Sequence, residues 1–133
     1  MKGKIIENIS NLYKVEANKE IYEATARGKF KKDEITPVVG DNVEIEIIDE
    51  QERKAVINKI EERSVYVKRP KMANITQIVL VVSSKHPKPD LLMLDKQLAF
   101  AELLCIKAII VLNKTDLDKE QSFKTIKNVY ENI

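Results

Sequence analysis

The pattern of apolar residues changes near residue 72, and this change constrains the fold of the 133-residue chain more than any other feature. Before it, short segments alternate between apolar and polar residues, most clearly in 41–48, where Val43, Ile45 and Ile47 alternate with acidic residues. Such alternation indicates strands with one buried and one solvent-facing side. After residue 72 the apolar segments are continuous, so the chain divides into two parts with different secondary structure.

The first part, residues 1–72, contains six short segments that are predicted to be strands, with polar turns between them. They are 2–7, 11–17, 20–27, 41–48, 54–60 and 64–67. Short strands separated by turns in this way favour a small closed barrel. An open sheet of the same size would leave exposed edges and little core. We therefore expect an all-β barrel of five or six strands over residues 1–72.

The second part, residues 73–133, is predicted to begin an α/β domain. Segments 75–82 and 107–112 are apolar on both faces, as buried parallel strands are. Between them, apolar residues after Asp90 recur with helical spacing, and a second helical stretch begins at Ser122. Strand, helix, strand, helix is the first part of such a domain. Three further apolar residues, Met93, Phe100 and Cys105, are expected to be packed inside.

The tetrapeptide Asn113-Lys114-Thr115-Asp116 directly follows the second apolar strand. Its N-K-x-D spacing is the one with which GTPases recognise guanine, at the carboxyl end of a parallel strand where α/β folds bind ligands. A carboxylate accepts two hydrogen bonds from the guanine ring N–H and amino group, a pair of donors that adenine lacks. We predict that Asp116 reads the base, Asn113 holds its edge and Lys114 covers its ring. The alternative is a polar loop without a ligand.

The 133 residues contain no phosphate loop. That loop has the pattern G-x-x-x-x-G-K-[ST], because its glycines let backbone N–H groups approach phosphate. Only Gly3, Gly28 and Gly40 are present, and no pair of them has this spacing. Either the protein does not hydrolyse nucleotides, or its phosphate loop lies after residue 133. The helical stretch still running at residues 130–133 favours a truncated chain.

Basic residues gather at two places, although the net charge is only +2. Lys and Arg neutralise RNA phosphates, an aromatic ring can stack on a base, and the loops of OB-type barrels bind oligonucleotides. We predict RNA contacts from both clusters: Arg27, Lys29, Phe30, Lys31 and Lys32 in the first, and Lys68, Arg69 and Lys71 in the second. From charge alone, a solvated hairpin tip with Phe30 packed inward is an equally good interpretation.

The barrel, the α/β unit and the early N-K-x-D resemble the amino-terminal part of the circularly permuted, ribosome small-subunit-dependent GTPases, the RsgA/YjeQ family. The similar segments keep the family's order along nearly the whole chain: Arg-Gly-Lys-Phe-Lys-Lys at 27–32, Thr-Pro-Val-Val-Gly-Asp-Asn-Val at 36–43, Glu-Arg at 62–63, Lys-Arg-Pro at 68–70, Asn-Ile-Thr-Gln at 74–77, Leu-Asp-Lys at 94–96, Ala-Glu at 101–102 and Asn-Lys-Thr-Asp-Leu at 113–117. Because this family is permuted, its guanine motif precedes its phosphate loop.

The resemblance implies an OB-fold barrel followed by an incomplete permuted GTPase domain. It implies a GTPase of late 30S maturation, stimulated by that subunit, with 16S rRNA and guanine nucleotide as partners. Mg²⁺ and phosphate binding, and a zinc site, are then expected outside these residues, so this chain alone should be inactive. The whole protein is expected to be a cytoplasmic monomer. No membrane partner is expected, since the longest apolar runs have five residues and a span needs about 20.

A different class of protein remains open at this point. The chain could be a non-enzymatic OB-fold RNA-binding module whose α/β appendage is purely structural. The two hypotheses differ in whether Asp116 affects nucleotide binding in the intact protein.

Overall fold

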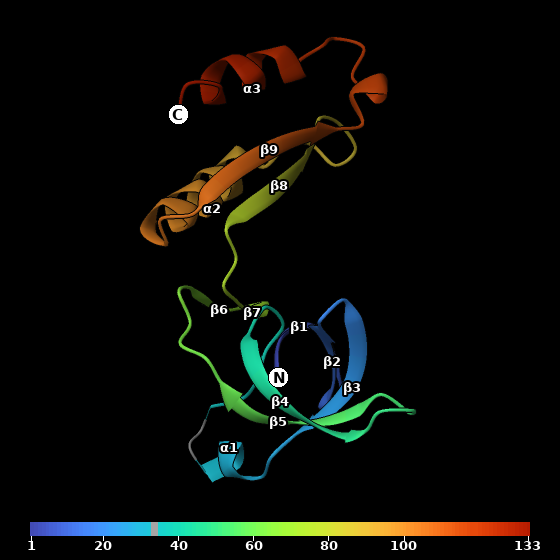
Figure 1. Cartoon of the computed structure of the whole chain (residues 1–133). Helices are drawn as coiled ribbons and strands as arrows, with labels where there is room; N and C mark the ends of the chain where they lie inside the picture. The colour runs from blue at the N-terminus through green and yellow to red at the C-terminus, as the bar shows by residue number, and fades with distance from the viewer. Residues whose placement is uncertain (33–34) are drawn as a thin grey trace. The chain divides into compact units, whose positions relative to one another are not determined.

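The computed structural model describes residues 1–32 and 35–133, without the side chains of Lys31 and Lys32. The described residues form two compact units, 1–75 and 76–133, and each is treated by itself below (Figure 1). The predicted domain boundary at residues 72 and 73 stays a prediction, because compactness alone does not show where an independently folding domain ends.

The first unit contains a closed five-stranded barrel, which confirms the predicted fold class. The strands follow the order β1-β2-β3-β5-β4 around the barrel, and only β3 and β5 pair in parallel. Closure removes the exposed sheet edges that a strand meander of this size would otherwise have. The bounds are β1 Lys2–Ile9, β2 Leu12–Ala17, β3 Glu20–Ala26, β4 Asn42–Asp49 and β5 Lys54–Ile60.

The sixth predicted segment, 64–67, does not join the barrel. Its last residues belong to β6 (Tyr66–Lys68), which pairs with β7 (Lys71–Ala73) in a separate two-stranded sheet. The sequence analysis missed β7, because a three-residue strand is too short to show alternation. The hairpin contacts the segment before β4 through a bridge between Val39 and Met72.

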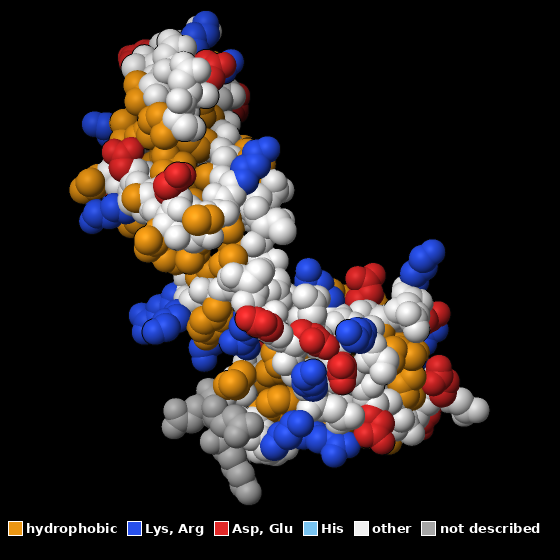
Figure 2. All heavy atoms as spheres, turned by 60° about the vertical axis from the view of Figure 1, so that its left-hand side comes forward, with side chains coloured by type: hydrophobic (Ala, Val, Ile, Leu, Met, Phe, Trp, Pro, Cys, Tyr) orange, Lys and Arg blue, Asp and Glu red, His pale blue; other side chains and the backbone are white. Residues whose placement is uncertain are grey.

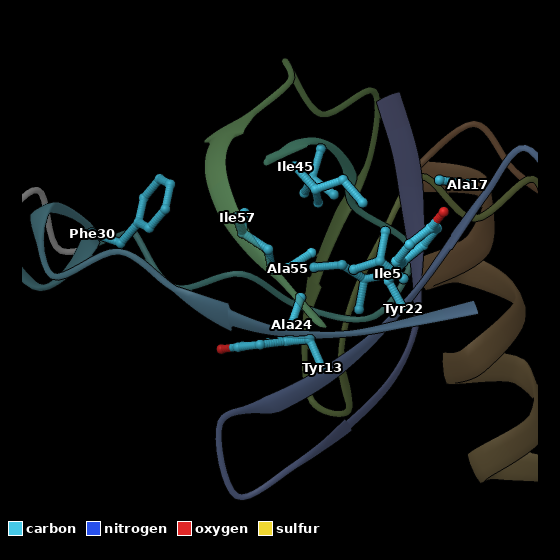
Figure 3. Close-up of a cluster of buried hydrophobic side chains, with 11 residues drawn as sticks. Ile5, Tyr13, Ala17, Tyr22, Ala24, Phe30, Ile45, Ala55 and Ile57 are labelled. Carbon is cyan, nitrogen blue, oxygen red and sulfur yellow. The ribbon is translucent and has the colours of Figure 1, made fainter. Parts of the chain in front are cut away.

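The barrel core is built from the inward-facing residues of all five strands (Figure 3). Tyr13, Val15, Val43 and Ile57 are each almost completely buried. Phe30, from the short helix α1 (Lys29–Lys32), also belongs to the buried cluster, although Figure 3 shows it apart from the other side chains. The alternating pattern therefore identified the barrel core correctly.

The second unit has the predicted order of strand, helix, strand and helix. It consists of β8 (Gln77–Ser83), α2 (Leu91–Leu103), β9 (Lys107–Asn113), a 3₁₀ turn η1 (Thr115–Leu117) and α3 (Phe123–Tyr130). The strands β8 and β9 run parallel and in register from the pair Gln77–Lys107 to the pair Ser83–Asn113. Both carboxyl ends therefore lie at the same edge (Figure 1).

Helix α2 packs against both strands but buries few of its apolar residues. Leu94 and Ala101 are buried, whereas Met93 is 52% and Phe100 43% exposed. The prediction that Met93 and Phe100 lie in the core was wrong, because this helix is apolar on several sides and its spacing does not select one face. Cys105 is also exposed, contrary to expectation. Figure 2 shows apolar side chains on the surface of this unit.

Candidate functional site

The guanine tetrapeptide lies where the α/β architecture places ligand sites. Asn113 is the last residue of β9, and Asp116 lies in η1, directly beyond the carboxyl edge of the parallel pair. Between them, Lys114 adopts a left-handed backbone conformation with φ 58°. This conformation turns the chain sharply after the strand, so that the tetrapeptide stays at the edge of the sheet.

Two hydrogen bonds join the tetrapeptide to the loop that follows β8. The Lys114 Nζ donates to the backbone carbonyl of His86 over 2.7 Å. The backbone N–H of Ser84 donates to the carbonyl of Asn113 over 2.9 Å. These bonds hold the ends of β8 and β9 together. His86 contributes its carbonyl here, and its imidazole is exposed.

The side chains that would read the base are exposed to solvent. Asn113, Lys114 and Asp116 are all exposed. Within residues 1–32 and 35–133, no hydrogen bond or ion pair involves the carboxylate of Asp116 or the side-chain amide of Asn113. A carboxylate without a protein partner can accept the two guanine donors without first losing another bond. The donor and acceptor set therefore fits guanine.

Asp118, which the sequence analysis did not single out, anchors the segment after the tetrapeptide. It is only 4% exposed, and its carboxylate accepts from the hydroxyl of Ser122 over 2.8 Å and the N–H of Phe123 over 3.0 Å. The hydrogen bond from Ser122, two backbone N–H bonds and the nearby Lys85 charge lower the pKa of Asp118, against the opposing effect of burial. An Asp shortly before a helix is a recognisable capping signal. It could have been found in the sequence.

The first basic cluster is only partly available for RNA. Arg27 is exposed but forms an ion pair with Glu46 at 2.7 Å, and Lys29 is exposed with its Nζ 5.4 Å from the centre of the Phe30 ring. Phe30 itself is 8% exposed, so the predicted stacking on a base is corrected in favour of the inward-packed alternative. A buried ring contributes to the barrel core instead. The side chains of Lys31 and Lys32 lie outside the described residues.

The second basic cluster lies on the β6–β7 hairpin. Lys68, Arg69 and Lys71 are exposed, and no ion pair within the described part of the chain includes them. Figure 1 shows this hairpin apart from α1. The structure therefore presents two separate basic clusters on the first unit. Among the residues whose side chains the structure describes, it does not bring the members of the two predicted RNA-binding groups into one patch.

A polar network that the sequence did not reveal connects the hairpin to the barrel. Arg63 donates two hydrogen bonds of 2.8 Å to the carboxylate of Asp41, which is completely buried. These bonds raise the pKa of Arg63. The side chain of Asn74 bonds to the carbonyl of Gly40 and the N–H of Ser64. A buried carboxylate that is fully paired in this way fixes local geometry more than a surface ion pair does.

Comparison with known proteins identifies the family. The model of the RsgA N-terminal domain matches residues 2–57, and the model of the RsgA GTPase matches residues 51–133. The chain belongs to the RsgA GTPase family. A curated relative from Alkaliphilus metalliredigens, named small ribosomal subunit biogenesis GTPase RsgA, is 41% identical over 132 residues. That alignment covers 99% of this chain and 45% of the relative.

Other RsgA relatives and two solved structures agree. The RsgA of Clostridium botulinum is 41% identical over 133 residues, with 45% of its length covered. YjeQ from Thermotoga maritima is similar with a TM-score of 0.80 and 31% identity, over 98% of this chain and 47% of that one. YloQ, described as a circularly permuted GTPase, is similar with a TM-score of 0.77 and 33% identity, over 98% of this chain and 48% of that one. The chain thus spans about half the length of these relatives, and the resemblance drawn from the motifs is confirmed.

Several residues that carried the resemblance to RsgA proteins meet in the polar network. Gly40 and Asp41 come from one motif, Arg63 from a second and Asn74 from a third. Gly40 has φ 94°, and a Cβ there would lie 1.9 Å from the carbonyl oxygen of Ala73. In the first unit, several of the residues that carry the family resemblance therefore have a structural role: they attach the β6–β7 hairpin to the barrel.

Proposed function

We propose that this chain is part of a GTPase that acts in late maturation of the small ribosomal subunit, and that this subunit stimulates its GTP hydrolysis. The observation that carries the proposal is the placement of Asn113 and Asp116 at the carboxyl edge of a parallel strand pair, where their side chains have no hydrogen-bond partner among the described residues. The names of the curated relatives, small ribosomal subunit biogenesis GTPases, support the choice of partner.

Three residues would contact guanine, each in a different way. The carboxylate of Asp116 would accept from the ring N–H and the amino group of guanine. The amide of Asn113 would hold the base edge, and the stem of Lys114 would lie over the ring while its Nζ remains bonded to the carbonyl of His86. GTP bound here would supply the phosphoryl group that is hydrolysed.

Other parts of the site are proposed to lie outside residues 1–133. The chain has no G-x-x-x-x-G-K-[ST] element, and the described residues contain no group of three metal-ligating side chains. The phosphate loop, the Mg²⁺ ligands and the zinc ligands are therefore assigned to the rest of the protein. This chain alone should bind guanine nucleotide weakly and should not hydrolyse GTP above the buffer rate.

The barrel is proposed to contact 16S rRNA within the 30S subunit. The exposed cations Lys29, Lys68, Arg69 and Lys71 would neutralise phosphates, with Arg27, Lys31 and Lys32 as further candidates. Phe30 is omitted because its ring is buried. The described residues include no helix long and apolar enough to cross a membrane, and we propose that the whole protein acts as a monomer in the cytoplasm.

The test uses the whole protein with purified ribosomal subunits. GTP hydrolysis is measured alone, with 30S subunits and with 50S subunits, and we expect stimulation by 30S only. The variant Asp116→Ala should lose guanine-nucleotide binding while still sedimenting with 30S. If Asp116→Ala leaves nucleotide affinity unaltered, the α/β unit is a structural appendage and the protein is an RNA-binding module.

A further inference from the structure

The β6–β7 hairpin cannot fix its own conformation. Each strand has three residues, and an isolated two-stranded hairpin is at best marginally stable in water. Lys68 and Lys71 also lie directly opposite each other in the pairing. Like charges in that position destabilise a strand pair, and Arg69 adds a third cation between them. The hairpin therefore depends on contacts outside itself.

The first external contact is made by Arg63, three residues before β6. Its guanidinium donates two hydrogen bonds to Asp41 at 2.8 Å and one to the carbonyl of Thr36 at 2.9 Å. The same group lies 4.7 Å from the ring centre of Tyr66, the first residue of β6. Asp41 is completely buried beside the barrel and also accepts from the N–H of Val38. One planar group thus joins the base of the hairpin to the barrel.

The second external contact is made by Asn74, directly after β7. Its Oδ1 accepts from the backbone N–H of Ser64 at 2.8 Å, and its Nδ2 donates to the carbonyl of Gly40 at 3.1 Å. Its own backbone N–H donates to the carbonyl of Val65. The Asn74 amide therefore connects the segment entering the hairpin, the segment leaving it and the barrel loop before β4.

We propose that Arg63, Asp41 and Asn74 are positioning residues, which hold the β6–β7 hairpin on the barrel so that Lys68, Arg69 and Lys71 meet RNA phosphates together. This inference rests on the proposed contact between the barrel and rRNA. Repulsion among three adjacent cations is relieved when a polyanion binds. A hairpin that is already held in place does not have to be ordered at the moment of binding.

Two variants each remove one side-chain part of the attachment without changing the net charge, while the backbone contacts between β7 and Val39 remain. Asn74 has φ 56°, a conformation that glycine adopts freely, so Asn74→Gly deletes the three hydrogen bonds of the side-chain amide and keeps the backbone path. Arg63→Lys keeps the charge but loses the paired donors that match the carboxylate. The matched control is Asn18→Gly, because Asn18 has φ 51° in the turn between β2 and β3 and no described side-chain hydrogen bond. Folding of each variant is checked by circular dichroism.

The readout is the salt dependence of binding to 16S rRNA. It is measured by filter binding at a temperature well below the midpoint of thermal unfolding of each variant. Each variant is made in the natural chain and in a chain that also carries Lys68→Ala, Arg69→Ala and Lys71→Ala. In the natural chain, Asn74→Gly and Arg63→Lys should each make the negative slope of log K against log salt shallower by about 1 or more. In the chain without the three cations they should have no further effect. The control Asn18→Gly should leave the slope unchanged.

The outcomes separate this inference from the proposed function. Equal slope losses in both backgrounds would mean that Arg63 and Asn74 act on the barrel as a whole, and would overturn the positioning role. Loss of slope on removing the three cations, but none with Asn74→Gly or Arg63→Lys, would also overturn it and leave the rRNA contact standing. If removal of the three cations changes nothing, the hairpin is not an RNA contact, and this inference fails together with that part of the proposed function.

Discussion

The substitution Gly40→Ala should destabilise the barrel strongly. Gly40 has φ 94°, which L side chains rarely adopt, and an added Cβ would lie 1.9 Å from the backbone oxygen of Ala73. Ala73 is 1% exposed and its N–H donates to the carbonyl of Val39. Relief of the clash therefore requires backbone movement, because neither the added Cβ nor the backbone oxygen of Ala73 belongs to a flexible side chain.

The magnitude follows from three contributions. A non-glycine residue in a sparsely populated conformation costs about 1–3 kcal/mol. The Ala73 carbonyl must move by more than about 1 Å, because Cβ contacts under 3.0 Å are essentially never seen. That shift breaks the hydrogen bond from Ala73 to Val39 and the one from Asn74 to Gly40, at about 1 kcal/mol each. The expected loss is about 3–5 kcal/mol of the free energy of unfolding.

The assay is urea unfolding followed by near-ultraviolet circular dichroism of tyrosine. Three of the four tyrosines lie in the first unit, with Tyr13 and Tyr22 in the barrel and Tyr66 in the hairpin, so the signal reports mainly on the first unit. Gly28→Ala is the matched control, because a Cβ there meets nothing within 4 Å, and it should change stability by less than about 1 kcal/mol. A loss below 1 kcal/mol for Gly40→Ala, or equal losses for both variants, would refute the reasoning.

Three further predictions concern charge. The pKa of Asp118 is lowered in the folded protein. Its contribution to stability is therefore present above the ordinary carboxyl pKa of about 3.9 and is lost as the pH falls through the folded value. Acid titration of α3 by circular dichroism should show this loss, and the variant Asp118→Asn should no longer show this acid-dependent loss. A hydrogen bond to Asp95 raises the pKa of Tyr130, so its stabilisation is present below pH of about 10 and is lost at higher pH. The pKa values of Tyr13 and Tyr22 are raised as well, so Tyr130→Phe should remove one tyrosine from the late part of the tyrosinate absorbance titration and leave the other two there. Lys29→Ala combined with Lys31→Ala should lower the salt slope of 16S rRNA binding by about 1–2; an unchanged slope would exclude α1 from the contact.

The predictable parts of this structure are those in which one physical rule acts locally. Alternation in 41–48 predicted β4, since the barrel buries one face of that strand. The continuous apolar run before Asn113 predicted β9, and with it the placement of the tetrapeptide at a strand end. Both patterns are produced by burial alone and can be read without knowing any distant contact.

The parts that could not be predicted depend on contacts between distant segments. Arg63 and Asp41 are 22 residues apart, and each is an ordinary charged residue in its own segment. Phe30 has the same immediate neighbours in the chain whether it packs inward or stacks on a base, so its burial follows only from the folded barrel. Helix α2 is apolar on several sides, and for that reason spacing alone did not show that Phe100 is exposed.

The most direct measurement compares GTP and XTP binding by the whole protein and by its Asp116→Asn variant. Asp116 is exposed and lies on the short η1 turn, so the substitution should change stability by less than about 0.5 kcal/mol. An amide supplies one acceptor and one donor in place of two acceptors, which suits the ring N–H and carbonyl of xanthine. We predict that the variant loses at least tenfold in GTP affinity, since hydrogen bonds to a charged group contribute about 1.5–3 kcal/mol each, and gains affinity for XTP. Unchanged preference for GTP would contradict the assignment of Asp116 as the residue that reads guanine.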